Sequence, residues 1–372
     1  MLKKSTVVSS SKTRESAWLG HLELLAGLPY PAAVLIPAVV AAVRSGFDAD
    51  FGDFGSTEGQ DLKPVGFWFE RISESGLHWF MANFDLAFAQ MSLREQLESD
   101  GESYRRMFSS PGIEESPAFK AICEPDGIRW LTGVPLLTRD GGCLGFLHLM
   151  RRASAGPFTD REQARLRRAR DSLRGLGEVK KSPQPCTLHP AGSAMLRVNA
   201  AGRITARNAR AHELLFHSHD SRIGALDWAA RNLSALPESV REMVRGLLIS
   251  NDGSDSIHYD LTLACGTMAF RAERLHALAG DGPEVIVTMT HMEPADLIVA
   301  RQLLNWSLSP KQKQLLVASV RQPSHQDLAQ QLGCTVGTLK AYINSLQAKL
   351  GVSSRQAFID RLLEDARQER ES

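Results

Sequence analysis

Residues 308–355 carry the start and stop signals of three short helices in close succession. Ser309 is a good N-cap, and the proline after it occupies the first helical position, where its missing N–H costs nothing. Ser324 has the same capping chemistry for a second helix, and Gly333 suits the left-handed exit from that helix. Thr335 caps a third helix almost at once. This spacing predicts two short helices that meet across a tight turn.

The third helix has one apolar face and one small, polar face. Four apolar residues recur at the spacing of a single helical stripe: Leu339, Ile343, Leu346 and Leu350. The opposite side carries Gly337, Ala341, Asn344 and Ala348, with Lys340 and Ser345 at its edges. A small polar face lets a helix lie deep in the major groove of DNA, where Asn pairs with adenine and Lys with guanine or phosphate. The hydroxyls of Ser324 and Thr335 are suited to phosphate.

An ordinary three-helix bundle without DNA contacts is the alternative, because short capped helices are common. The local charge favours DNA. Between Arg301 and Ile359 the chain has seven basic residues and one acidic residue, a net charge of +6 in a protein whose total is +1. A basic segment in a near-neutral chain is expected of a nucleic-acid-binding module.

The segment resembles the C-terminal helix-turn-helix of LuxR-type transcriptional regulators. The matching positions are 308–311, Leu315 and Leu316, Leu328 and Ala329, Leu332, 338–340, 349–352, Ser354 and Arg355. The resemblance implies that Lys340, Ala341 and Asn344 face bases, and that Thr338 and Lys349 lie near the DNA backbone. The predicted DNA-contacting set is Ser324, Thr335, Gly337, Thr338, Lys340, Ala341, Asn344, Ser345 and Lys349. The chain departs from the family at Gln312, Gln314, Gln322 and Tyr342, which bears on the preferred DNA sequence.

Cysteine usage and hydropathy point to the cytoplasm, with the protein on the nucleoid when it binds DNA. None of the five cysteines forms a C-x-x-C pair, so neither a disulfide framework nor a zinc site is expected, and free thiols fit a reducing compartment. The most apolar run, 31–43, is too short for a membrane span of about 20 residues. It predicts a buried helix. Residues 1–14 are expected to be a disordered tail.

Residues 15–176 are expected to form a first α+β domain. Helices at 16–26 and 31–45 precede a Gly- and Asp-rich loop at 46–61, and 65–69 and 77–84 are strand candidates. The segment 86–122 is mostly polar, and we expect it to be helical or irregular. Asp140-Gly141 between two apolar runs predicts a hairpin. Thr159 caps the next helix, with Glu162 in the capping-box position.

That final helix carries a narrow apolar seam of the kind that pairs with a copy of itself, formed by Leu166, Ala169, Leu173 and Leu176. This seam and the last helix, 355–366, are the predicted dimerisation surfaces. The stretch 145–166 resembles the last strand and final helix of a GAF domain. The resemblance implies a domain that senses a signal or dimerises.

Residues 177–191, with two prolines and a charge cluster, have the composition of a linker. Residues 192–293 then resemble a PAS domain. They show a strand, a turn and a strand over 195–206, a helix that Asn208 opens, a helical stretch at 224–249 and three antiparallel strands to Met292. Residues 294–306 are the expected connector to the helix-turn-helix domain, 307–368. The predicted fold class is therefore multidomain, with GAF-like and PAS-like α+β sensor domains followed by an all-α domain.

Candidate ligand sites in these domains have more than one interpretation. The aromatic residues Phe67, Trp68, Phe69, Trp79 and Phe80 line a ligand pocket or form ordinary core, and we favour core. The cluster His212, His217 and His219 lacks an acidic or Cys partner, which favours exposed polar histidines over a metal or haem site. Cys123 and Cys143 lie among apolar residues, which favours inert thiols. The sequence names no cofactor.

Catalytic motifs are missing. The chain has no phosphate-binding G-x-x-x-x-G-K-[ST] loop, no G-x-S-x-G and no H-E-x-x-H, so it is not expected to be an enzyme. The interpretation is a signal-responsive transcriptional regulator. It would bind double-stranded DNA as a homodimer, with a small-molecule ligand and RNA polymerase as further candidate partners and no membrane. The alternative is a protein-binding module that recruits polymerase, on an interaction scaffold that binds no ligand.

Overall fold

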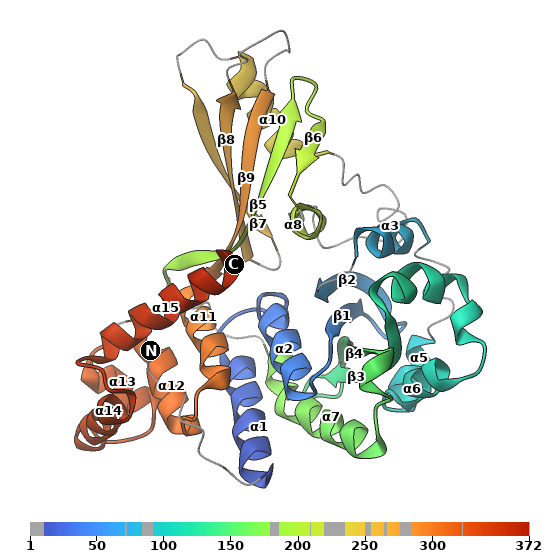
Figure 1. The fold of residues 1–372 in the computed structure, drawn as a ribbon. Coiled ribbons are helices and arrows are strands. Elements are labelled where there is room, and N and C mark those ends of the chain that lie inside the picture. Colours follow the sequence, from blue (N-terminus) through green and yellow to red (C-terminus); the bar gives the residue numbers. More distant parts are fainter. Residues whose placement is uncertain are drawn as a thin grey trace.

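The computed structural model describes residues 11–70, 73–83, 92–178, 186–208, 210–218, 235–249, 254–263, 266–275, 284–321 and 323–371. Within them, two antiparallel sheets each carry helices, and a group of helices follows at the C-terminal end (Figure 1). This layout agrees with two α+β regions and one all-α region. None of the described helices is long and apolar enough to cross a membrane.

The first sheet has four strands in the order β2-β1-β4-β3, and each neighbouring pair is antiparallel. They are β1 (Phe51–Glu58), β2 (Lys63–Glu70), β3 (Ile128–Leu137) and β4 (Cys143–Arg152). The predicted hairpin at Asp140-Gly141 is confirmed. Its turn closes with a hydrogen bond from Thr138 N to the Gly142 carbonyl at 2.8 Å, and Gly141 supplies the positive φ of 89°.

Two expectations for this region are wrong. Residues 46–61 are not a loop, because 51–58 form β1, which is hydrogen-bonded to β2 on one side and to β4 on the other. Residues 77–82 are not a strand, because they lie in helix α3 (Glu74–Ala82). The Ser73 side chain caps that helix by accepting a backbone hydrogen bond at 3.2 Å. Residue 84 of the predicted strand lies outside the described residues.

Helices surround the first sheet. They are α1 (Ser11–Gly27), α2 (Ala32–Gly46), α5 (Leu93–Glu98), α6 (Glu102–Ser109) and α7 (Asp160–Ser172). Short turns of other helix types are η1 (Ile113–Glu115), η2 (Phe119–Cys123), η3 (Glu124–Asp126), η4 (Ala153–Ala155) and η5 (Arg174–Gly177). The predicted helices at 16–26 and 31–45 are confirmed, as is the Thr159 capping box of α7. Of the predicted tail, residues 11–14 are helical and 1–10 lie outside the described residues.

The predicted apolar seam of the α7 region is not available for dimerisation, and the apolar residues of the last helix are also covered. All four seam residues of the α7 region, Leu166, Ala169, Leu173 and Leu176, are buried in the chain's own core beside α1 and α2. The last helix, α15 (Arg355–Glu371), likewise buries Phe358, Ile359, Leu362 and Ala366. A narrow apolar stripe on a helix can pack against any apolar surface of suitable shape. For the seam of the α7 region, that surface is provided by helices of the same chain.

The second sheet has five strands in the order β6-β5-β9-β8-β7, again with antiparallel neighbours. Its elements are β5 (Leu188–Asn199), β6 (Ile204–Arg207), α8 (Ala211–Ser218), α10 (Glu238–Ile249), β7 (Ser256–Leu263), β8 (Gly266–Leu275) and β9 (Glu284–Pro294). The predicted strand–turn–strand–helix order and the three later strands agree with these elements. Helices α8 and α10 cover one face, and the core there includes Phe270, Val287 and Val244. Residues 224–234 of the predicted middle helix lie outside the described residues.

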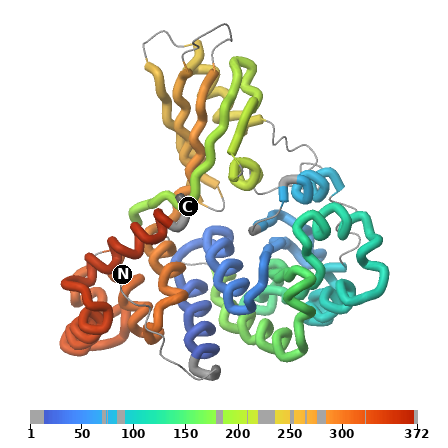
Figure 2. The backbone as a smooth tube through the Cα atoms, in the orientation of Figure 1, coloured from blue at the N-terminus to red at the C-terminus, as the bar shows by residue number. Residues whose placement is uncertain are grey.

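The C-terminal part consists of helices. They are α11 (Ala295–Gln302), η6 (Leu303–Asn305), α12 (Pro310–Ser319), α13 (His325–Gln331), α14 (Val336–Leu350) and the α15 helix given above. Helix α12 packs on α11 and also on α1, at the opposite end of the sequence (Figures 1 and 2). One apolar core therefore runs from α1 and α2 through α11 into the last four helices.

Candidate nucleic-acid interface

The helix starts of the C-terminal part follow the predicted capping pattern. Ser309 and Gln312 form a complete capping box at α12. At α13 the Ser324 hydroxyl accepts from Asp327 N at 3.1 Å and donates to the Asp327 carboxylate at 2.6 Å. These bonds fix where each helix begins. They also place an acidic group on the hydroxyl that we expected to contact phosphate.

Helix α14 begins at the Thr335 cap. The Thr335 hydroxyl accepts from Thr338 N at 3.1 Å and lies 2.9 Å from the Thr338 hydroxyl, so this end of the helix presents two linked hydroxyl groups to solvent. Gly351 ends the helix with a φ of 62°. The helix is thus held at both ends by local interactions, which its sequence dictates.

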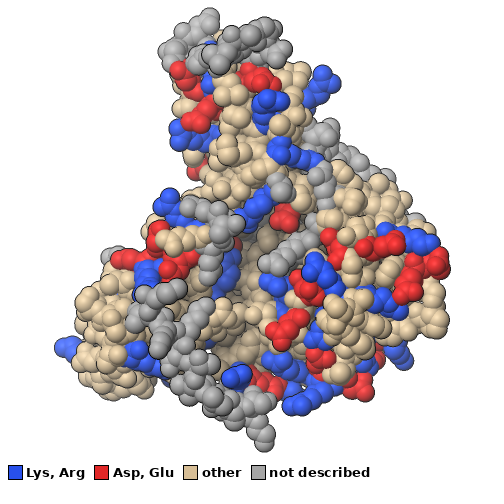
Figure 3. Space-filling model, in the orientation of Figure 1, with Lys and Arg blue, Asp and Glu red and all other residues tan. Residues whose placement is uncertain are grey.

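The two faces of α14 are separated as expected. Leu339, Leu346 and Leu350 are buried and Ile343 is half-buried. Every residue of the predicted DNA-contacting set is exposed: Ser324, Thr335, Gly337, Thr338, Lys340, Ala341, Asn344, Ser345 and Lys349. In Figure 3 the surface over α13 and α14 is mostly neutral, with few basic side chains in that view. The outer face of α14 is therefore free to enter a groove while the apolar stripe stays covered.

The basic charge at the interface is smaller than the sequence count indicates. Arg301 pairs with Glu293 at 2.8 Å and Arg321 with Asp296 at 2.8 Å, and both acids lie just before residue 301, where the basic segment begins. Lys313 is buried, and burial lowers its pKa to about 8. The exposed basic residues are Lys311, Lys340 and Lys349. Electrostatic attraction to DNA therefore depends on fewer side chains than predicted.

A buried polar network holds these helices to the rest of the chain. The Tyr30 hydroxyl donates to Asp296 Oδ1 at 2.6 Å and accepts from the Arg321 guanidinium at 2.8 Å. Arg321 also donates to Asp296 Oδ2 from Nε at 3.0 Å. Burial and the hydrogen bond to Asp296 raise the pKa of Tyr30 well above its ordinary value. Nothing in the sequence pattern linked these residues, because Tyr30 and Arg321 are 291 residues apart.

Close to this network, His21 of α1 faces Lys313 of α12. Its side chain is buried, and neither ring nitrogen has a hydrogen-bond partner among the described residues. Burial, with a smaller contribution from the positive charge of Lys313, lowers the pKa of His21 to about 3. The imidazole is therefore neutral in the folded protein at neutral pH.

The buried His21 predicts an acid-sensitive contact. Its folded pKa lies below the unfolded value of 6.5, so the unfolded chain binds the extra proton as the pH falls from about 6.5 towards 3. The contribution of the neutral His21 to the free energy of unfolding is fully present above about pH 6.5. It should fall by about 2 kcal/mol by pH 5. Urea unfolding at several pH values measures this loss. We expect His21→Leu to flatten the curve, whereas the exposed control His325→Leu should keep the wild-type pH dependence.

Replacing two glycines near the turn with alanine, one at a time, should change the stability of the protein in opposite directions. Gly337 lies in α14 and has open space, since the nearest atom to an added Cβ is the Thr335 hydroxyl at 3.8 Å. Gly337→Ala should stabilise by about 0.5–1 kcal/mol. Gly333 also has space, but its φ of 60° is left-handed, so Gly333→Ala should destabilise by about 1 kcal/mol. Thermal unfolding compares the two, and a shift in the same direction for both would contradict the backbone assignment.

In the part of the chain that the structure describes, the His and Cys residues form no metal site and no reactive thiol. No group of three or more His, Cys, Asp or Glu residues suited to a metal ion occurs among the described residues. Of the histidine cluster, His217 stacks on Trp68 with ring centroids 4.2 Å apart, and His219 lies outside the described residues. Burial raises the pKa of the Cys123 thiol to about 12 and also raises that of Cys143, which agrees with inert thiols.

Three capped helices with an exposed, small and polar third helix define a helix-turn-helix module of the DNA-binding class. Residues 306–362 match the family described as "GerE: Bacterial regulatory proteins, luxR family". The C-terminal part of the chain is thus a LuxR-family helix-turn-helix domain, which is typical of transcriptional regulators. This match confirms the coarse prediction for that segment and covers none of the two sheet-containing regions.

Whole-chain comparisons add little. No curated protein matches the chain significantly. Among solved structures, the sensor region of a sensor histidine kinase is 12% identical, over 77% of this chain and 94% of that one, with a TM-score of 0.18. An uncharacterized protein from Mycobacterium tuberculosis is 12% identical, over 65% of this chain and 64% of that one, with a TM-score of 0.17. Likeness at these TM-scores carries no weight for fold or function.

Proposed function

We propose that the protein is a transcriptional regulator that places the outer face of α14 in the major groove of a specific double-stranded DNA site. The observation that carries the proposal is the division of α14: its apolar stripe is buried and its small polar face is exposed. Lys340, Ala341 and Asn344 would contact bases, and Thr338 and Lys349 would lie near the backbone. The protein would act in the cytoplasm, where bacterial DNA lies.

The two sheet-containing regions would receive a signal or support dimerisation, as GAF-like and PAS-like domains. The domain limits proposed are 15–176, 192–293 and 307–368, with 177–191 and 294–306 as connections. We infer a dimer because a single helix-turn-helix contacts only about 1,000 Å² or less, and two copies on a two-fold symmetric site gain the affinity that regulation needs. Since the α7 seam and the apolar residues of α15 are buried in this chain, a surface other than these residues would form the dimer.

Substitutions on α14 test the groove contact. With a site selected from random DNA, Lys340→Ala or Asn344→Ala should each weaken binding by about 1–3 kcal/mol, or about 5- to 150-fold in Kd, because each removes a base contact. Fluorescence anisotropy titration measures this effect, and the same titration gives the number of chains per duplex. Arg245→Ala on α10 is the charge-matched control, because Arg245 is exposed and far from α14 in the sequence.

Equal binding by wild type, Lys340→Ala and Asn344→Ala would contradict the assignment of α14. Capture of RNA polymerase without DNA, lost on substitution of the same residues, would favour the polymerase-recruiting alternative. Two chains per duplex is the expected stoichiometry, and one chain per duplex would contradict the dimer.

A further inference from the structure

A cavity of about 100 Å³ lies between one face of the first sheet and helices α3, α6 and η2. Ordinary core is the expected role of the aromatic residues in this region, yet Phe67, Phe69 and Phe80 line this cavity. They form one wall, with Phe80 edge-on to each of the others at centroid distances of 5.2 Å. Phe108 and Phe119 line it from the helices.

This arrangement suits a flat aromatic guest. Aromatic rings attract one another in edge-to-face and offset-stacked geometry, beyond the gain from burying apolar area. The volume is of the order of the roughly 150 Å³ at which an apolar protein cavity accepts benzene. The Cys123 thiol on the wall is neutral, because burial raises its pKa to about 12. The walls therefore offer dispersion and ring contacts rather than charge.

The cavity has one polar corner. Asp53 on β1 and His148 on β4 both line it, with His148 Nδ1 at 2.7 Å from Asp53 Oδ1 and side chains 13% and 7% exposed. That hydrogen bond uses Oδ1 of the Asp53 carboxylate, so Oδ2 can accept a hydrogen bond from a donor on a bound molecule. Gln96 approaches His148 Nε2 with its Oε1 at 3.3 Å. The Gln96 amide nitrogen is buried and has no hydrogen-bond partner among the described residues.

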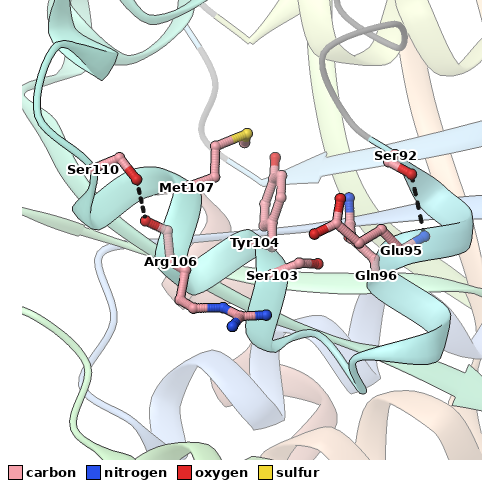
Figure 4. Close-up of a pocket in the computed structure, with 8 residues that line it drawn as sticks. All are labelled: Ser92, Glu95, Gln96, Ser103, Tyr104, Arg106, Met107 and Ser110. Atoms are coloured by element: carbon pink, nitrogen blue, oxygen red, sulfur yellow. Dashed lines mark hydrogen bonds between the residues drawn. The ribbon is translucent and has the colours of Figure 1, made fainter.

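A hollow of about 350 Å³ adjoins the cavity. It lies between α5 and α6, and Tyr104 and Met107 line both spaces. Figure 4 shows Tyr104 in this hollow, with Gln96 and Glu95 on one side of it and Met107 and Arg106 on the other. A polar substituent on a guest in the cavity could extend past Tyr104 into this hollow.

From this geometry we propose that the first region binds a small, uncharged aromatic molecule that carries an N–H or O–H donor. The ring lies among Phe67, Phe80 and Phe119, and the donor bonds to the Asp53 carboxylate. No Lys or Arg is among the described residues that line the cavity, while one carboxylate is, so aromatic anions are disfavoured. The proposal deepens the sensory role given above, because it names the chemical class of the signal.

Calorimetric titration of the full-length protein without DNA tests the site, with phenol and indole as probes. Toluene has the shape of phenol but no hydrogen-bond donor, so it is the control for the donor. Benzoate is an aromatic anion of similar size, so it is the control for charge. Phenol or indole should bind at least about 10-fold more tightly than toluene, since a hydrogen bond to a charged group contributes that much. Benzoate should bind more weakly than phenol.

Two variants locate the binding. Asp53→Asn keeps an oxygen for His148 but loses the carboxylate, so phenol binding should weaken at least about 10-fold. Ala118→Trp places a large side chain in the cavity wall and should abolish binding, whereas Ala155→Trp, at an exposed position outside the cavity, should not change it. Thermal unfolding of each variant checks that it remains folded.

Failure of both probes to bind wild type would overturn the proposal, as would equal binding of toluene and phenol. Unchanged binding by a folded Ala118→Trp variant would also overturn it. Because these titrations contain no DNA, they fail or succeed independently of the anisotropy measurements on α14. If the protein binds phenol but no DNA, the proposal of this binding site stands and the proposed regulatory function is contradicted.

Discussion

Replacing Asp296 by alanine should lower the free energy of unfolding by about 3–5 kcal/mol. The Asp296 side chain is 3% exposed, and its carboxylate accepts hydrogen bonds from both Tyr30 and Arg321. The substitution removes the negative charge from this group of three residues and leaves the Arg321 guanidinium, just after α12, without its carboxylate partner on α11. Removing one partner of a buried pair costs far more than the pair contributes as a whole. Urea unfolding monitored by tryptophan fluorescence measures the change.

An exposed ion pair gives the matched control. Arg361 and Asp365 lie one turn apart on α15, at 3.8 Å and with side chains 41% and 42% exposed. Asp365→Ala should change stability by less than about 1 kcal/mol, because solvent screens surface pairs. Equal losses for Asp296→Ala and Asp365→Ala would show that the network around Tyr30 does not hold the C-terminal helices.

Leu339→Ala should destabilise the protein by about 2–5 kcal/mol. Leu339 is fully buried in the core that α14 shares with the neighbouring helices, and truncation leaves a cavity there. Since that core continues into α11, α12 and α1, the loss should appear in the main unfolding transition rather than in a separate step for α14. Differential scanning calorimetry distinguishes these outcomes.

The next residue is the control for Leu339. Lys340→Ala removes an exposed side chain from the same turn and should leave the unfolding transition in place while it weakens DNA binding. Leu339→Ala should reduce both. A Leu339→Ala protein as stable as wild type would mean that the apolar stripe of α14 is not packed as described.

Features encoded locally could be predicted from the sequence. The caps at Ser309, Thr335 and Thr159 depend on contacts within a few residues, and all three form as expected. The faces of α14 follow from helical periodicity, and the hairpin at Asp140-Gly141 from the needs of a tight turn. Much of the candidate DNA interface is built from such local features. For this reason the residues predicted to contact DNA are also the ones that are exposed in the structure.

Features that depend on distant partners could not be predicted. The Gly- and Asp-containing segment 51–58 looks like a loop by composition, but two neighbouring strands supply its hydrogen bonds. The aromatic stretch from Leu77 has strand propensity, yet Ser73 begins a helix there. The charges of Arg301 and Arg321 are cancelled by acids that a count over the module misses. In each case tertiary context outweighs local preference.

The hydrogen bond between Tyr30, just after α1, and Arg321, just after α12, joins residues that are made far apart in time during synthesis. Tyr30 leaves the ribosome first and must wait for Arg321, 291 residues later. At about 5–20 residues per second, that interval is about 15–60 s. Throughout it, the residues of α1 that will pack on α12 lack that partner, although α2 and α7 are already available to pack on the rest of α1. The contacts between α1 and α12 are therefore among the last to form during synthesis, and a nascent chain that stalls before α12 leaves part of the apolar surface of α1 open to chaperones and proteases.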